Sequence, residues 1–209
     1  MNPDYSRWTL LLSSAFFGGT AYCVLTWLSI GFYPGHISPL DNYLSVLGNS
    51  SLNPSGAIFY NLAVILAGIS LIPFYVGLFQ TFGEEGRNRI LTLAMTIGVL
   101  NTVAIMMSGV FSEDVYDIHY LASFSIFLTW IPVLLLTNLA LLNQGGFIMW
   151  TSRYGLVLGV IDTLFMFYVL LFGTDTGAII EWVTIFSFVA WTVLLAIPSL
   201  RNYRALSVA

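Results

Sequence analysis

The run "GAIFYNLAVILAGISLIPFYVGLFQTF", residues 56–82, contains no charged residue. An α-helix rises 1.5 Å per residue, so about 20 apolar residues cross the hydrocarbon core of a membrane. The run exceeds that length and lacks the alternation of apolar and polar residues that marks a strand. It therefore predicts a transmembrane helix.

The rest of the chain has the same character. Of its 209 residues, 58% are hydrophobic and 8% are charged, whereas a soluble domain carries about 25% charged residues. The predicted spans are residues 8–32, 56–82, 90–111, 119–143, 152–173 and 178–200. We therefore expect an all-α polytopic membrane protein whose residues 1–209 form a single six-helix transmembrane domain.

The arginines predict how the chain is oriented. The chain has no lysine, and with six spans its arginines all fall on one side of the membrane: Arg7, Arg87, Arg89, Arg153, Arg201 and Arg204. Most acids fall on or near the other side: Asp41, Glu113, Asp114, Asp117, Asp175 and Glu181. Because cytoplasmic loops are enriched in basic residues, we expect a multi-pass protein of the cell membrane with both termini in the cytoplasm.

The longest outer loop, residues 32–56, is rich in Pro, Gly, Ser and Asn but also carries apolar residues at intervals. A solvated linker would not need them. The loop is therefore predicted to be a structured cap over the outer helix ends, with a short interfacial helix near residues 40–47. Asn49 begins a glycosylation sequon. Either glycosylation of Asn49 or a role of Asn49 in a turn would explain this motif.

Two stretches resemble a known family. They are "LSVLGNSSLNPSGAIFYNLAVILAGISLIPFYVGL" (44–78) and "GVFSEDVYDIHYLASFSIF" (109–127). They resemble an uncharacterised six-helix membrane family of bacteria and archaea, known as a domain of unknown function and similar at a distance to Frag/DRAM-type membrane proteins. The matching residues are Ser45, Leu47, Gly48, Asn53, Pro54, Phe59, Asn61, Gly68, His119, Ala122 and Phe127, with the asparagine spacing offset at Tyr60 and Ser112 in place of a proline. The resemblance implies the fold and supplies no activity.

His119 follows an acidic loop at the start of the fourth predicted span, and two interpretations remain open. In the first, Asp117 caps the helix and His119 bonds a loop carbonyl at the membrane interface. In the second, His119 turns inward and meets Ser45 or an acid such as Asp41 or Glu181, forming a proton-transfer or head-group site. Asp117 and His119 would point about 200° apart on a helix, so we expect no metal site.

Asp162 lies inside the fifth predicted span. A charge there is costly, so we expect this residue to face the bundle and be protonated, or to lie in a wet cavity. Its candidate neighbours are Asn101 and Thr129, with Asn61 further out. Either a functional role or a hydrogen bond that holds helices together would explain it.

A capped bundle with polar groups at its outer mouth and aromatic walls suits a head group above and chains below. We therefore expect an outward-facing pocket that binds a lipid or small amphiphile, with membrane lipids as partners. The candidate ligand-binding residues are His119, Ser45, Asp41, Glu181, Asn61 and Asp162, and no catalytic residue is singled out.

Three other functions stay open. They are an accessory or structural subunit of a larger membrane complex, an intramembrane hydrolase using Ser45, His119 and an acid, and a proton-coupled transporter using Asp162. The sequence contains no phosphate-binding glycine loop, no paired haem histidines and no basic patch. We therefore expect no cofactor and no nucleic-acid partner.

Overall fold

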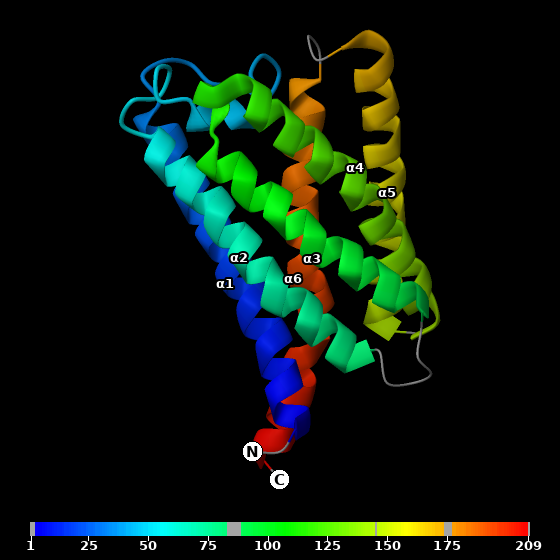
Figure 1. The fold of residues 1–209 in the computed structure, drawn as a ribbon. Helices are drawn as coiled ribbons and strands as arrows, with labels where there is room; N and C mark the ends of the chain where they lie inside the picture. The colour runs from blue at the N-terminus through cyan, green and yellow to red at the C-terminus, as the bar shows by residue number, and fades with distance from the viewer. Residues whose placement is uncertain (1–2, 83–88, 145, 174–176, 209) are drawn as a thin grey trace.

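Six long helices form the molecule, as the sequence predicts (Figure 1). The structure, a computed structural model, describes residues 3–82, 89–144, 146–173 and 177–208, with side chains between residues 10 and 198. The long helices of this part are α1 (Pro3–Phe32), α2 (Ala57–Phe82), α3 (Arg89–Val110), α4 (Tyr116–Leu141), α5 (Gly146–Phe172) and α6 (Ala178–Val208). Short 3₁₀ helices are η1 (Leu44–Gly48), η2 (Glu113–Val115) and η3 (Leu142–Gln144). Each long helix contains a segment apolar and long enough to cross a membrane, so the chain is an all-α multi-pass membrane protein.

The long helices form a ring. Each packs against the next along the chain, and α6 closes the ring by packing against α1. One side of each helix can therefore face a shared interior, where Phe74, Tyr75 and Trp191 are fully buried. The opposite side carries exposed apolar side chains such as Leu121 and Leu170. Helices that are apolar all round suit a protein whose outer surface faces lipid.

Several helices begin or end away from their predicted limits. α4 begins at Tyr116 instead of 119, α5 at Gly146 instead of 152, and α6 continues to Val208. Hydropathy marks the part of a helix that lies in lipid, whereas backbone hydrogen bonding continues into polar residues at its ends. The prediction that Asp117 is the N-cap of this helix is wrong, although the residue does lie at the end where the helix dipole favours a carboxylate. The N-cap of α4 is Val115, and Asp117 lies exposed in the first turn.

The Pro3 end of α1 and the Val208 end of α6 lie together at one end of the bundle (Figure 1). The loop of residues 33–56 lies at the opposite end, which we call the capped end. Arg89 and Arg153 are exposed. The side chains of Arg7, Arg201 and Arg204, and the whole of Arg87 and Asp175, lie outside the described residues. The orientation across the membrane stays a prediction.

The loop of residues 33–56, called the cap from here on, is structured. Its short helix is the 3₁₀ helix η1, a little later in the chain than the predicted segment at 40–47. Leu44 and Leu47 of η1 are fully buried, so this apolar turn packs against the ends of the helices. The apolar residues that distinguish the loop from a linker are thus explained by packing.

Hydrogen bonds fasten the cap to several helices. The side-chain amide of Asn53 donates hydrogen bonds to Ser29 Oγ of α1 at 3.0 Å and to the Leu47 carbonyl at 2.9 Å. Asn61 of α2 donates to the Gly48 carbonyl at 3.0 Å. A Cβ at Gly48 would overlap the Asn61 side chain, so glycine is needed for this close approach. Three residues of the family pattern therefore hold the cap closed.

A second set of contacts joins the cap to α6 and to the α3–α4 connection. The Trp182 indole donates to the Asn42 carbonyl at 2.9 Å. The backbone N–H and hydroxyl of Ser50 donate to Asp114 at 3.0 and 2.9 Å. The Asn49 side chain accepts a hydrogen bond from the N–H of Ser51 at 2.9 Å and so closes a turn. A turn at Asn49 was one of the two explanations left open for this glycosylation sequon.

Candidate functional site

Two cavities meet beneath the cap. The first, which we call the interior cavity, measures about 90 Å³ and is lined by α1, α2, α3, α4, α6 and η1. The second, the α4–α5 cleft, measures about 120 Å³ and is lined mainly by α4 and α5, with residues from η1, η2 and α6. Five residues line both cavities and so lie between them: Ser45, His119, Ser123, Phe127 and Glu181. We call this set the junction.

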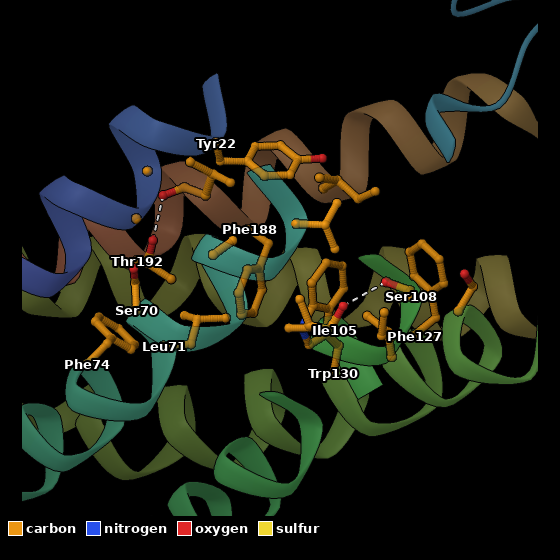
Figure 2. A pocket seen from close by; sticks show the side chains of 18 of the residues that line it. Tyr22, Ser70, Leu71, Phe74, Ile105, Ser108, Phe127, Trp130, Phe188 and Thr192 are labelled. Atoms are coloured by element: carbon orange, nitrogen blue, oxygen red, sulfur yellow. Dashed lines mark hydrogen bonds between the residues drawn. The ribbon is translucent and has the colours of Figure 1, made fainter. Parts of the chain in front are cut away.

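The interior cavity is polar near the cap and apolar along most of its depth. Figure 2 shows Trp130 and Phe188 among the side chains that line it, and their rings stack with centroids 4.2 Å apart. Its far part reaches Phe74 of α2 and Thr192 of α6. The lining is thus mostly aromatic and aliphatic, with one group of polar residues at the junction and the hydroxyls of Ser14, Ser70 and Thr192 toward the far end.

His119 is buried and faces the bundle, with 8% of its surface exposed. Its Nδ1 lies 3.1 Å from the Ser108 carbonyl and 3.0 Å from the Phe111 carbonyl. Carbonyl oxygens only accept hydrogen bonds, so we assign the proton to Nδ1. Nε2 then has a free lone pair, and the Ser123 hydroxyl donates to it at 3.3 Å. The ring is held in one orientation because it satisfies carbonyls at the end of α3.

Glu181 connects the cap to the junction. It lies in the first turn of α6, where the positive end of the helix dipole favours a carboxylate. Its side chain is 5% exposed, and its Oε2 accepts the Leu44 N–H at 2.6 Å. Tyr22 and Tyr60, which also line the interior cavity, are hydrogen-bonded to each other. A buried carboxyl group, two phenols and an imidazole therefore surround the polar end of the cavity.

Glu113 supplies a second carboxyl group to the α4–α5 cleft. Its side chain is half-buried and is hydrogen-bonded by the Asn49 side chain. Its Oε2 atom is buried and has no hydrogen-bond partner among the described residues. Tyr116 and Tyr120 line the same cleft, with stacked rings whose centroids are 6.1 Å apart. The cleft is thus both acidic and aromatic.

The structure brings together three of the residues singled out from the sequence. His119, Ser45 and Glu181 all belong to the junction. Asp41 is exposed in the cap and lines neither cavity. Asn61 makes its hydrogen bond to Gly48 and lines neither cavity, so its observed contact is with the cap.

Asp162 is fully buried on α5 and also lies outside both linings. Asn101 donates to Thr129 at 2.6 Å and to the Ile126 carbonyl at 3.1 Å, joining α3 to α4. Neither Asp162 oxygen has a hydrogen-bond partner among the described residues. The expected link between Asp162 and these two side chains is therefore not formed.

Sequence reasoning did not single out Ser123 or Glu113 as site residues. Ser123 could have been found, because a residue four positions after His119 lies on the same face of a helix. Glu113 could not, because only the path of η2 brings a loop acid to the cleft. Tyr116 and Tyr120 were not singled out either, because only the packing of α5 against α4 makes them line a cleft.

The fold and the site together define a six-helix, multi-pass membrane protein with a fastened cap above a polar junction between two cavities. Residues 16–198 match the family described as "Protein of unknown function (DUF998)". The match covers most of the chain, and the protein therefore belongs to this family. Comparison with curated proteins and with solved structures gives no match.

Proposed function

We propose that the protein binds a lipid or other small amphiphile, with its head group at the junction and its chain in the interior cavity. One observation carries the proposal: the polar lining residues Ser45, His119, Ser123 and Glu181 gather where the interior cavity meets a second opening. Toward the far end the lining is mostly apolar, and the hydroxyls of Ser14, Ser70 and Thr192 there donate to carbonyls of their own helices. A ligand with one polar end and one apolar end matches this division.

The head group should supply most of the affinity. An apolar chain that moves from lipid into a protein cavity gains little, because lipid tails are as apolar as the cavity wall. Hydrogen bonds made in a low-dielectric interior are stronger than those made in water. The junction residues should therefore matter more for binding than Phe74 or Phe188 along the wall.

The α4–α5 cleft offers a route from the bilayer. Tyr116 and Tyr120 line this cleft and are 60% and 43% exposed on the surface of the bundle. The ribbons of α4 and α5 separate toward the capped end (Figure 1). The cap covers that end through the buried Leu44 and Leu47. Lateral access between α4 and α5 is consequently the more direct path for an amphiphile.

Native mass spectrometry tests the proposal. The protein would be reconstituted in nanodiscs of phosphatidylethanolamine and phosphatidylglycerol, released, and examined for retained lipid. His119→Ala removes hydrogen bonds at the junction and should lower retention about 10-fold, the effect of roughly 1.4 kcal/mol. His36→Ala is the matched control, because His36 is exposed in the cap. Equal retention by the two variants, or no retained lipid in the unmodified protein, would contradict the proposal.

One contact favours hydrolysis as a second candidate function. The Ser123 hydroxyl donates to Nε2 of His119, and carbonyls hold the Nδ1–H of the same ring. This arrangement would let His119 accept the serine proton during attack on an acyl group. Here Ser123 replaces Ser45, the serine favoured from the sequence.

A fluorophosphonate probe separates the two functions. Hydrolysis predicts labelling of Ser123 that is lost in His119→Gln, because glutamine can donate a hydrogen bond to the carbonyls but cannot take up the proton. Binding alone predicts no labelling and predicts that His119→Gln retains more lipid than His119→Ala.

A further inference from the structure

We infer that the head group bound at the junction is a cation, namely the ammonium group of an amine-bearing amphiphile. This inference rests on the proposed function and adds the chemical class of the ligand. It follows from two independent features of the lining, its charge and its aromatic rings.

Among the described lining residues, the ionisable side chains other than His119 and the tyrosines are all carboxyl groups. Glu113 and Glu181 line the α4–α5 cleft, and Glu181 also lines the interior cavity. None of the described residues that line either cavity is lysine or arginine. Like charges repel and opposite charges attract, and both effects are stronger in a protein interior than in water. A head group with a net negative charge and no ammonium group would therefore be disfavoured, whereas a head group that carries an ammonium group, as in phosphatidylethanolamine, would be attracted.

The hydrogen-bonding groups point the same way. The Oε2 of Glu113 is a buried acceptor with no partner among the described residues. Glu181 already accepts the Leu44 N–H through Oε2, and the carboxylate has further lone pairs. An ammonium group carries donors only. Its N–H groups match a lining whose charged groups are acceptors.

The aromatic rings form the second feature. Tyr116, Tyr120 and Phe124 line the cleft along one side of α4. Their successive rings stack with centroids 6.1 and 6.4 Å apart. Tyr43 of the cap lines the cleft as well. Aromatic faces attract a cation through their electron-rich surface, and the attraction is stronger where the cation is desolvated. These rings line the α4–α5 cleft beside the junction, so they would attract an ammonium group at that side of the junction independently of the carboxyl groups.

A panel of ligands with the same tail and different heads tests the inference. Dodecylamine, dodecanol and dodecyl phosphate would be titrated, below their aggregation thresholds, into the protein in phosphatidylcholine nanodiscs at pH 7, with empty nanodiscs as the blank. The amine is protonated at this pH. We expect calorimetry to give at least 10-fold tighter binding for dodecylamine than for either of the other two.

The carboxyl groups are tested by Glu113→Gln and Glu181→Gln. Glutamine at 181 keeps an oxygen that can accept the Leu44 N–H, and Glu113 is only half-buried, so at least one variant should retain the fold. Each substitution should weaken dodecylamine binding about 10-fold, as expected for a lost charge-assisted hydrogen bond. The control is Asp117→Asn, which removes an exposed charge at the same end outside both linings and should change nothing.

The outcomes distinguish the inference from the proposed function. If dodecanol or dodecyl phosphate binds as tightly as dodecylamine, an amphiphile site exists but the inference about its head group is wrong. The inference also fails if Asp117→Asn weakens binding as much as Glu113→Gln does, because general surface charge would then explain the preference. If none of the three ligands binds, the proposed function fails as well.

Discussion

Replacing Asn53 with alanine should release the cap from α1. The Asn53 side chain is fully buried, and its amide nitrogen lies within 3.3 Å of three acceptors, the Ser29 carbonyl, Ser29 Oγ and the Leu47 carbonyl. The amide has two hydrogens, so two hydrogen bonds are lost at once. The Leu47 carbonyl keeps a donor, because Ser29 Oγ lies 3.4 Å from it and donates to it. Two net hydrogen bonds contribute about 1–3 kcal/mol, so the closed cap should lose roughly that much relative to an open one.

Limited proteolysis of the protein in nanodiscs measures this loss. When opening and closing are fast, cleavage follows the population of the open form, and roughly 1–3 kcal/mol raises that population about 5-fold to 150-fold. Cleavage within residues 33–56 should accelerate accordingly. Asn143→Ala is the control, because Asn143 is an exposed amide in η3. Cleavage of Asn53→Ala at the rate of this control would refute the assignment of Asn53 as the main fastening of the cap.

Three further predictions follow from packing, burial and topology. Gly77→Ala would place a Cβ 2.8 Å from a backbone nitrogen of α1 and should therefore destabilise the bundle by about 1–3 kcal/mol, measured by thermal unfolding. Gly31→Ala is the control, because a Cβ there would meet nothing within 4 Å and should not destabilise the bundle. Asp162→Leu should raise the free energy of unfolding by about 1–3 kcal/mol because the carboxyl group has no partner among the described residues; a loss of stability would instead indicate a partner that holds the helices together. In a cysteine-free background, cysteines at Ser51 and Gln144 should react with a membrane-impermeant thiol reagent from opposite sides, and labelling of both from one side would rule out the topology.

The six spans could be predicted from sequence because crossing a membrane is a local requirement. Each span must be apolar over about 20 residues wherever its neighbours lie. The cap was predictable for a similar reason, since apolar residues such as Leu44 and Leu47 have no function in a solvated linker. Their burial confirms that interpretation.

The site was only partly predictable. His119 stood out because histidine is rare in so apolar a chain, yet the sequence left open whether it faced lipid or the bundle. Contacts with the Ser108 and Phe111 carbonyls decide that its ring faces inward. The Phe111 carbonyl is a loop carbonyl of the kind that the first interpretation of His119 expected. The Ser108 carbonyl belongs to α3, so no pattern within α4 could have revealed that contact.

What the sequence alone determined is the number of spans, the structured cap and the polar residues that had to be explained. The tertiary structure decided which of these residues meet. Ser45, His119 and Glu181 come from η1, α4 and α6, and share one junction because the ring of helices closes and the cap folds over it. Asp41 and Asp162 were equally conspicuous in sequence but lie outside both cavities. The physical reason is that hydropathy acts on each segment separately, whereas a binding site depends on the rotation and packing of several helices at once.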